Sequence, residues 1–214
     1  MNQGELQRKV EGVEKLITPY LPKEEGFQKT LAEAVNYSFL AGGKRLRPLL
    51  MQESFKLLGG KSRVVEPFMA ALEMIHNYSL IHDDLPCMDN DEYRRGRKTT
   101  HVVYGEGMAV LAGDALLNLA YETAHQAFEL IDKEDPAEYR AVAEALKVLG
   151  NKAGIYGMAG GQATDVEAEK KQLPVTAPML LFIHKKKTAA LIEAALMIGG
   201  ILAGASEEQV AALE

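Results

Sequence analysis

The sequence of 214 residues has little cysteine and few aromatic residues, which disulfide-rich and nucleic-acid-binding proteins need. It contains one cysteine, Cys87, so no disulfide can form within the chain and a cysteine-rich zinc site is excluded. Tryptophan is absent and aromatic residues make up 7%, which leaves few rings on which unpaired bases could stack. The net charge of −6 is unfavourable for binding a polyanion. Together with the scarcity of aromatic rings, it argues against a general nucleic-acid-binding protein.

Long apolar runs are also missing. The most apolar stretch, Ala189–Ala205, is interrupted by Glu193, and no uncharged run in it reaches the 18 or so residues that a membrane span needs. The first residues, MNQGELQRKVEGVEKL, are polar and contain no apolar core of a secretory signal. The sequence therefore predicts no membrane span and a cytoplasmic location.

Apolar residues are plentiful, at 47%, and they recur at the spacing of helices. Leu6, Val10, Val13 and Ile17 define a first amphipathic helix, and the segment Pro67–Ile81 is apolar around most of its circumference, as expected of a buried helix. No alternating run predicts a strand. Further helices are expected over 28–40, from Arg47 to the Gly59-Gly60 pair, over 107–131, 137–149, 151–169, 176–186 and 188–202, and from Ser206 onward, with 93–100 as a charged loop. The prediction is an all-α bundle in a single domain, residues 1–214.

An acidic segment follows the buried helix directly. Residues 83–92 hold five carboxylates among Leu85, Pro86, Cys87 and Met88, which a solvated acidic loop would rarely need. Carboxylates held this close repel one another unless a cation is bound. Mg²⁺ takes oxygen ligands, typically one or two carboxylates together with the phosphates of a substrate. The spacing thus favours a metal site over a solvated loop, and it does not match a calcium EF-hand.

Three basic clusters accompany the acidic segment. They are Arg94-Arg95 with Arg97-Lys98, the segment Gly43–Pro48 with Lys44, Arg45 and Arg47, and Lys185–Lys187. Each alone is most simply a solvated face. In an acidic protein, all three together suit a substrate with several phosphates, because Arg offers forked donors and Lys a point charge.

Three residues on the buried helix lie near the acids. His76 precedes Asp83 by two helical turns and Ser79 precedes it by one, so His76, Ser79 and Asp83 lie on one face of the helix. We expect His76 to contact the substrate, although a lone histidine on an apolar helix is more often a core residue. A packed core ring is the simplest interpretation of Tyr78.

Four segments of the sequence resemble motifs of a known protein family. The stretch Met74–Asp91, with Arg94-Arg95-Gly96, resembles the first aspartate-rich motif of the trans-isoprenyl diphosphate synthases, the polyprenyl synthetase family. Its DDxxxxD form with an internal proline is similar to the bacterial type of farnesyl diphosphate synthase. Residues 42–48 resemble the family's isopentenyl-diphosphate-binding segment, Gly160–Asp165 its GQxxD segment, and Lys187-Thr188 its KT pair. All four segments come in the family order, so the resemblance covers essentially the whole chain.

The resemblance implies an isoprenoid synthase-type helical bundle that joins an allylic diphosphate to isopentenyl diphosphate. It implies that Asp83 and Asp89, helped by Asp84, hold Mg²⁺, or Mn²⁺ in its place, against the allylic diphosphate. Breaking the carbon–oxygen bond leaves negative charge on that diphosphate, which metal ions and arginines stabilise. The apolar helices around the site would keep water from the allylic cation.

The other implied roles concern substrate binding. The residues that would bind isopentenyl diphosphate are Lys44, Arg47, His76 and Arg95. Those that would face the allylic substrate are Arg94 and Lys187, with the side-chain oxygens of Thr188 and Gln162 toward the cation. Asp165 is equally open to a structural and a site role, whereas a structural role is favoured for Asp114.

Product length would depend on the helix that leads to Asp83. The growing chain would run down this helix from the metal ions, with Tyr78 and Ser79 as its floor. In the family, an aromatic residue five positions before the first aspartate accompanies short products. We therefore expect the C15 product, farnesyl diphosphate, and the C20 product geranylgeranyl diphosphate is the alternative.

One departure from the family concerns its second aspartate-rich motif. Asp83-Asp84 is the only Asp-Asp pair in the sequence, so we expect a chain that is incomplete at its C-terminus and has little or no turnover by itself. A non-catalytic subunit of a heteromeric synthase is a further alternative, which the intact first motif disfavours. A terpene cyclase would not need Lys44, Arg47 and His76. The family is usually homodimeric, and residues 107–131 suit either an interface or the core.

Overall fold

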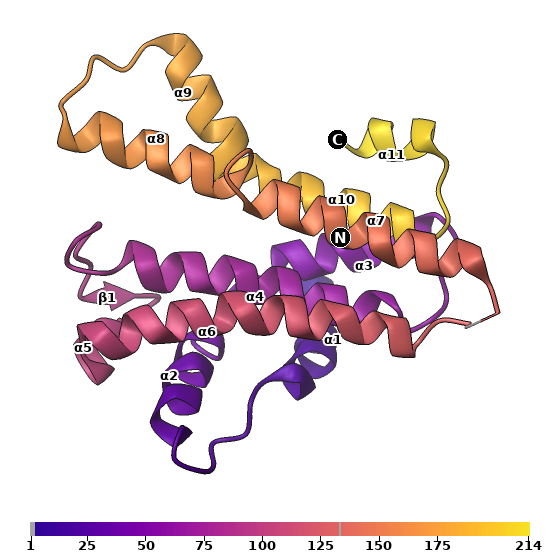
Figure 1. Ribbon diagram of the computed structural model, residues 1–214, viewed down its shortest axis with the longest axis horizontal. Helices are drawn as coiled ribbons and strands as arrows, with labels where there is room; N and C mark the ends of the chain where they lie inside the picture. The colour runs from indigo at the N-terminus through magenta and orange to yellow at the C-terminus, as the bar shows by residue number, and fades with distance from the viewer. Residues whose placement is uncertain (1–2, 133) are drawn as a thin grey trace. The chain divides into compact units, whose positions relative to one another are not determined.

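The computed structural model describes residues 3–132 and 134–214, and these residues are helical almost throughout, as the sequence predicts (Figure 1). The all-α fold class is therefore confirmed. The elements are, in chain order, α1 (Gln3–Ile17), the 3-10 turn η1 (Thr18–Tyr20), α2 (Lys29–Phe39), α3 (Leu46–Leu57), α4 (Val65–Asp83), β1 (Tyr93–Arg94), β2 (Arg97–Lys98), α5 (Thr100–Tyr104), α6 (Glu106–His125), the 3-10 turn η2 (Gln126–Glu129), α7 (Pro136–Ala153), α8 (Met158–Lys170), α9 (Ala177–Ile183), the π-helical segment η3 (His184–Ala189), α10 (Ala190–Leu202) and α11 (Glu207–Leu213).

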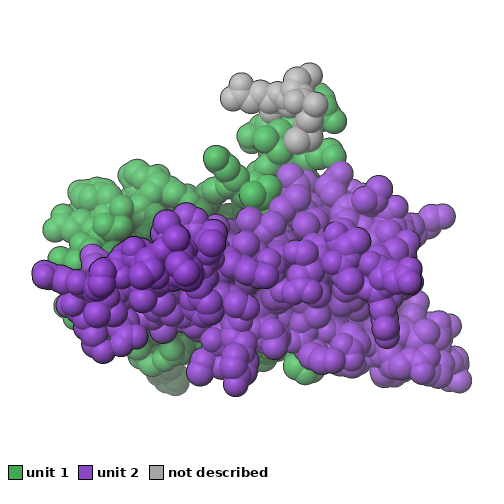
Figure 2. Space-filling model, turned by 90° about the horizontal axis from the view of Figure 1, so that it is seen from above, with its two compact units in different colours: residues 1–46, 70–125 green, residues 47–69, 126–214 purple. Residues whose placement is uncertain are grey.

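The chain divides into two compact units, each made of two separate stretches of sequence. Unit 1 comprises residues 1–46 and 70–125, and unit 2 comprises residues 47–69 and 126–214. Figure 2 shows the two units in different colours. The acidic segment and its arginines belong to unit 1, whereas Gln162, Lys187 and Thr188 belong to unit 2.

In unit 1, the C-terminal part of α4 and the helix α6 lie side by side (Figure 1). The α4 residues Ala70–Leu72, Met74 and Ile75 are completely buried, as expected of a helix that is apolar all round. The hydroxyl of Thr123 on α6 donates to the sulfur of Met74, and the His82 ring contacts the carbonyl oxygen of Val110 at 3.1 Å. A Cβ atom at Gly113 would collide with the His82 ring, so the glycine permits this close approach.

In unit 2, α10 packs against α7 and α3. Leu191, Ala194, Ala195 and Ile198 are completely buried, and the hydroxyl of Ser54 on α3 donates to the carbonyl oxygen of Leu196 at 2.8 Å. The most apolar stretch of the sequence is therefore a core helix. None of the helices in the described part of the chain has the length and hydropathy that a bilayer-crossing helix requires.

The predicted charged loop over residues 93–100 is wrong in part, because it contains a short hairpin. Strands β1 and β2 are antiparallel, with Tyr93 opposite Lys98 and Arg94 opposite Arg97. Arg95 and Gly96 at the turn both have positive φ, 53° and 76°, which is the geometry of a tight two-residue hairpin. With two residues per strand, the hairpin is too short to produce the alternation by which strands are recognised.

Several predicted helix boundaries also differ. Helix α7 continues past Leu149 to Ala153, and α8 begins only at Met158, so the single helix expected over 151–169 is broken at Gly154–Gly157. The break expected near Lys187 is absent, because the π-helical segment η3 joins α9 to α10. The helix expected over 107–131 ends at His125 and is followed by a 3-10 turn. The helix expected from Ser206 onward is α11, and it begins with a capping box in which Ser206 and Gln209 exchange hydrogen bonds in both directions.

Candidate active site

The acidic segment folds back onto the end of α4. The backbone N–H of Asp89 donates to the carbonyl oxygen of Asp83 at 2.9 Å, and the N–H groups of Met88 and Asn90 both donate to the carbonyl oxygen of Leu85. Leu85 is 6% exposed and anchors the segment, whereas Asp89 is exposed. The fold therefore brings Asp89 back beside Asp83, although six residues separate them in the sequence.

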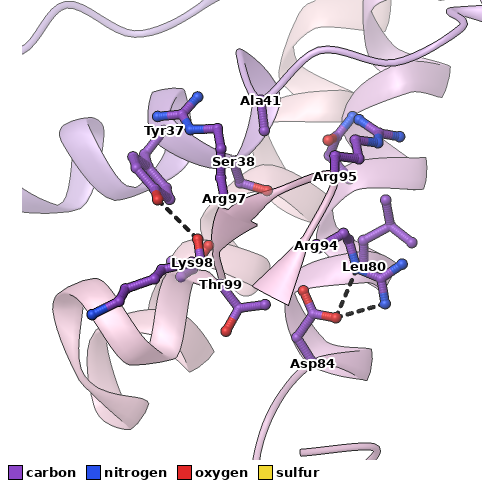
Figure 3. Close-up of a pocket in the computed structure, with 12 residues that line it drawn as sticks. Tyr37, Ser38, Ala41, Leu80, Asp84, Arg94, Arg95, Arg97, Lys98 and Thr99 are labelled. Atoms are coloured by element: carbon purple, nitrogen blue, oxygen red, sulfur yellow. Dashed lines mark hydrogen bonds and ion pairs between the residues drawn. The ribbon is translucent and has the colours of Figure 1, made fainter. Parts of the chain in front are cut away.

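Asp84 forms an ion pair with Arg94 of the hairpin (Figure 3). The Nε and Nη2 atoms of Arg94 lie 2.7 and 2.6 Å from the same carboxylate oxygen, Oδ1, and the Asp84 side chain is 6% exposed. Burial raises the pKa of the Asp84 carboxyl, and the hydrogen bond and charge of Arg94 oppose that rise. The hydrogen bond to Asp84 raises the pKa of Arg94. Asp84 thus fixes the arginine that was predicted to bind the allylic diphosphate.

Arg95, at the turn of the hairpin, docks onto the loop Gly42–Arg45. Its Nη1 atom donates to the carbonyl oxygen of Gly42. A Cβ atom at Gly43 would lie 2.8 Å from the same Nη1, and the φ of Gly43, 140°, is one that residues with a Cβ rarely adopt. Burial lowers the pKa of the Arg95 guanidinium. The structure therefore brings Arg95 next to the loop that carries Lys44.

The hairpin is braced further by α2. The Tyr37 hydroxyl donates to the carbonyl oxygen of Lys98 at 2.8 Å, and the Arg97 guanidinium lies 4.3 Å from the centre of the Tyr37 ring. The cavity that Figure 3 shows between these elements has a volume of about 30 Å³ and is lined by Asp84, Arg94, Arg95 and neighbouring residues. This volume has room for one or two water molecules, and the pocket opens to solvent.

The predicted chain-length floor lies on the part of α4 that faces α6. The Tyr78 ring meets the His82 ring edge-on, with 5.9 Å between the ring centres. Burial raises the pKa of the Tyr78 phenol, and the nearby Tyr121 of α6 adds to the rise. The Ser79 hydroxyl donates to the carbonyl oxygen of His76, so it is held within its own helix. Tyr121 was not predicted, and an aromatic side chain on the helix expected over 107–131 is its only sequence signal.

Asp165, whose role the sequence left open, pairs with Lys187 in unit 2. The Lys187 Nζ lies 2.7 Å from Asp165 Oδ2. Gly161 is one turn before Asp165 on α8, and a Cβ atom there would collide with the backbone nitrogen of Lys187. Both the backbone and the side chain of Lys187 are therefore placed by one face of α8. Gln162 is half-buried and Thr188 is exposed on the same two elements.

The remaining predicted residues differ in their exposure to solvent. Lys44 is exposed, Arg47 and His76 are half-buried, and Arg47 lies in unit 2. The Asp114 side chain is 64% exposed, and its Oδ1 lies 3.8 Å from Nε2 of His82. The sequence grouped Arg45 with the other cations of its segment, but Arg45 is buried.

The acidic segment fits a metal ion that is shared with a substrate. In residues 3–132 and 134–214, no group of three or more His, Cys, Asp or Glu side chains is arranged to hold a metal ion alone. Mg²⁺ usually needs only one or two carboxylates when phosphates complete its coordination. Asp83 and Asp89, joined by a backbone hydrogen bond, supply such hard oxygen ligands.

Comparison with known proteins places these motifs in a family. The family model described as "Polyprenyl synthetase" matches residues 28–214. The chain is 44% identical over 203 residues to the Arabidopsis thaliana heterodimeric geranylgeranyl pyrophosphate synthase large subunit 1, covering 94% of this chain and 53% of that protein. It is 42% identical over 209 residues to the farnesyl diphosphate synthase of Geobacillus stearothermophilus, covering 98% and 68%.

A solved structure agrees with these relatives. The structure of an FPP/GFPP synthase from Zymomonas mobilis matches 99% of this chain and 74% of that one, with a TM-score of 0.89 and 35% sequence identity. This confirms the predicted isoprenoid synthase-type bundle. The chain spans about half the length of the curated plant relatives it matches. The matched region includes every motif described above, and the chain belongs to the polyprenyl synthetase family.

Proposed function

We propose that the chain is part of a short-chain prenyltransferase that condenses isopentenyl diphosphate with dimethylallyl or geranyl diphosphate to give farnesyl diphosphate. The observation that carries the proposal is the arrangement at the end of α4. There a carboxylate pair, Asp83 and Asp89, lies beside a hairpin that fixes Arg94 on Asp84 and Arg95 on the Gly42–Arg45 loop. Carboxylates that could hold a metal ion and cations that could bind a diphosphate thus lie within one unit, which supports the proposal.

The roles of the side chains follow from this chemistry. When bound, Mg²⁺ supplies positive charge to the diphosphate that leaves the allylic carbon. Asp83 and Asp89 would hold the ion, and Arg94 and Lys187 would bind the same diphosphate as its negative charge grows. Lys44, Arg47, His76 and Arg95 would hold isopentenyl diphosphate, whose double bond attacks the allylic carbon. The Gln162 and Thr188 oxygens would stabilise the cation, and the released diphosphate takes up the proton lost from the new product.

The test is equilibrium binding of geranyl thiolodiphosphate, which cannot ionise, measured calorimetrically with Mg²⁺ and with a chelator. We expect binding that the chelator abolishes and that Asp83→Asn and Asp89→Asn each weaken at least about tenfold. Glu144→Gln, an exposed carboxylate on α7, is the matched control and should bind normally. Binding that is indifferent to the chelator and to both substitutions would overturn the proposed metal site.

Product length needs a second measurement, because relatives with both kinds of name are similar to this chain. Geranylgeranyl diphosphate is the alternative product, favoured by the 44% identity to the Arabidopsis protein. Incubation of the protein at its natural length with Mg²⁺, isopentenyl diphosphate and dimethylallyl diphosphate should give a C15 product, and Tyr78→Ala should lengthen it. A C20 product from the unsubstituted chain would reject Tyr78 as the floor. Binding without any product would favour the non-catalytic subunit.

We also propose a homodimer, following the family resemblance, and a cytoplasmic location, which the sequence predicts. Light scattering during gel filtration measures the mass of the protein in solution directly. A mass near 23.4 kDa, that of one chain, would contradict the dimer.

A further inference from the structure

Arg45 differs from the other cations of its segment because its side chain points into unit 1 and not toward solvent. The residue is 3% exposed, and its guanidinium makes three contacts. Nε lies 3.1 Å from Oε1 of Glu14, Nη1 lies 2.9 Å from Oε1 of Glu73, and Nη2 donates to the carbonyl oxygen of Phe39 at 2.8 Å. One side chain therefore ties the Gly42–Arg45 loop to α1, α2 and α4.

The backbone of this loop depends on that anchor. Gly42, Gly43 and Arg45 all have positive φ, at 83°, 140° and 45°. Glycine adopts such angles freely, but a residue with a Cβ atom does so only where its surroundings hold it there. The contacts of the Arg45 guanidinium provide that restraint. The carbonyl oxygen of Gly42, which receives the hydrogen bond from Arg95, is part of the same turn.

Glu73 links Arg45 to Arg95 electrostatically. Burial lowers the pKa of Arg95, the Glu73 carboxylate raises it, and the Arg45 guanidinium lowers it again, so both groups act on Arg95. Arg94 responds to other groups, since its pKa is raised by Asp84, Asp83 and Asp91 against the effect of burial. Glu73 is 2% exposed and is bound by Arg45, which neutralises it. Without Arg45, the buried carboxylate would attract the Arg95 guanidinium.

We infer that Arg45 is a positioning residue for the isopentenyl diphosphate subsite: by binding Glu73 it holds the Gly42–Arg45 loop on α4 and leaves the Arg95 guanidinium for the substrate. The inference rests on the proposed function, since it assumes that Lys44 and Arg95 bind isopentenyl diphosphate. Arg45 acts through these neighbours and does not itself touch the diphosphate, because its side chain is only 2% exposed. The allylic subsite, with Arg94 fixed on Asp84, should be independent of it.

The experiment compares two ligands and two variants. Arg45→Met removes the cation and leaves Glu73 charged, whereas Arg45→Met with Glu73→Gln removes both charges and avoids a buried unpaired carboxylate. Calorimetry measures the dissociation constants of isopentenyl diphosphate and of dimethylallyl thiolodiphosphate, the latter with Mg²⁺. Arg63→Met is the matched control, because Arg63 pairs with Glu66 at 2.8 Å on the surface. Urea unfolding monitors the stability of each protein.

We expect the double variant to bind isopentenyl diphosphate roughly tenfold more weakly, about the effect of one misplaced charged donor. The single variant should bind it more weakly still, because the charged Glu73 then draws Arg95 away. Binding of the allylic analogue should change by less than about threefold in either variant, and Arg63→Met should change neither constant. A purely structural role would weaken both ligands alike, in proportion to the lost folded fraction.

Four results would overturn the inference. Unchanged binding of isopentenyl diphosphate by the folded double variant would show that Arg45 does not position the subsite. Equal weakening for both ligands would assign Arg45 to general stability. If the double variant does not fold, Arg45→Gln removes the charge beside Glu73 and keeps hydrogen-bond donors, and normal binding of isopentenyl diphosphate by that folded variant would also contradict the inference. Absence of binding by the unsubstituted chain would overturn the proposed function itself, and the inference with it.

Discussion

Two ion pairs, one in each unit, have nearly the same length but different surroundings. Arg94 Nη2 lies 2.6 Å from Asp84 in unit 1, and Lys187 Nζ lies 2.7 Å from Asp165 in unit 2. The Asp84 side chain is 6% exposed, whereas that of Asp165 is 41% exposed. Arg94 uses two nitrogens on its partner and Lys187 uses one. The contact distance alone therefore says little about how strongly either pair holds its cation, because burial and donor geometry differ.

The difference extends to how each cation is placed. Arg94 owes its position to its own side chain, which is bound to the carboxylate at the end of α4. Lys187 is placed by the backbone as well, since the π-helical segment η3 lies directly against Gly161 of α8. Such π segments are common at functional sites, where they change the direction of side chains. We call the surroundings of the Asp84–Arg94 pair the first region and those of the Asp165–Lys187 pair the second. Removing the cationic side chain should therefore destabilise the first region more, and replacing a glycine should destabilise the second more.

The largest effect is expected from the buried pair. Arg94→Met leaves the Asp84 carboxylate buried without its partner, which should lower the free energy of unfolding by about 3 kcal/mol. Lys187→Met removes a cation from an accessible carboxylate and should lower it by at most about 1 kcal/mol. Urea unfolding at neutral pH measures both. Equal losses would contradict the argument that burial distinguishes the two pairs.

A smaller effect is expected from the two glycines at helix contacts. Gly161→Ala places a Cβ against a backbone nitrogen, which cannot move without shifting η3, and should cost roughly 2 kcal/mol. Gly113→Ala places a Cβ against the His82 ring, which can rotate away, and should cost roughly 1 kcal/mol. Gly12→Ala on α1, where a Cβ meets nothing, is the control. Thermal unfolding ranks the three, and a larger loss for Gly113→Ala would reverse the comparison.

The smallest effect is expected at alkaline pH, and it concerns the half-buried Tyr78 of unit 1. Burial raises the pKa of Tyr78, so the folded chain holds this proton more tightly than the unfolded chain does. The stability that this proton contributes is therefore lost as pH rises above about 10, the value for an unfolded tyrosine. Between about pH 9 and pH 11, Tyr78→Phe should lose up to about 1 kcal/mol less stability than the unsubstituted chain. Tyr93→Phe, at an exposed position, should show no such difference.

Much of the first region could be predicted from the sequence because its residues lie close together in the chain. The acidic segment and the two arginines span residues 83–95, so spacing alone indicated a common site. The pairing of Asp84 with Arg94 could not be predicted, because it depends on a hairpin with strands of two residues each. In the second region Asp165 and Lys187 are 22 residues apart, and no local pattern marks them as partners.

The helical character of the chain, the buried helix that leads to Asp83 and the charged residues of the proposed diphosphate site can all be recognised in the sequence. These follow from periodicity and from residue chemistry, which are local properties. Which cations of a cluster are bound by carboxylates inside the protein depends on the packing of distant segments. Lys44 and Arg45 are neighbours in one basic segment, yet the first is exposed and the second is buried on Glu73. The physical reason is that a buried charge is tolerated only where another segment supplies its partner, and that partner comes from a distant part of the chain.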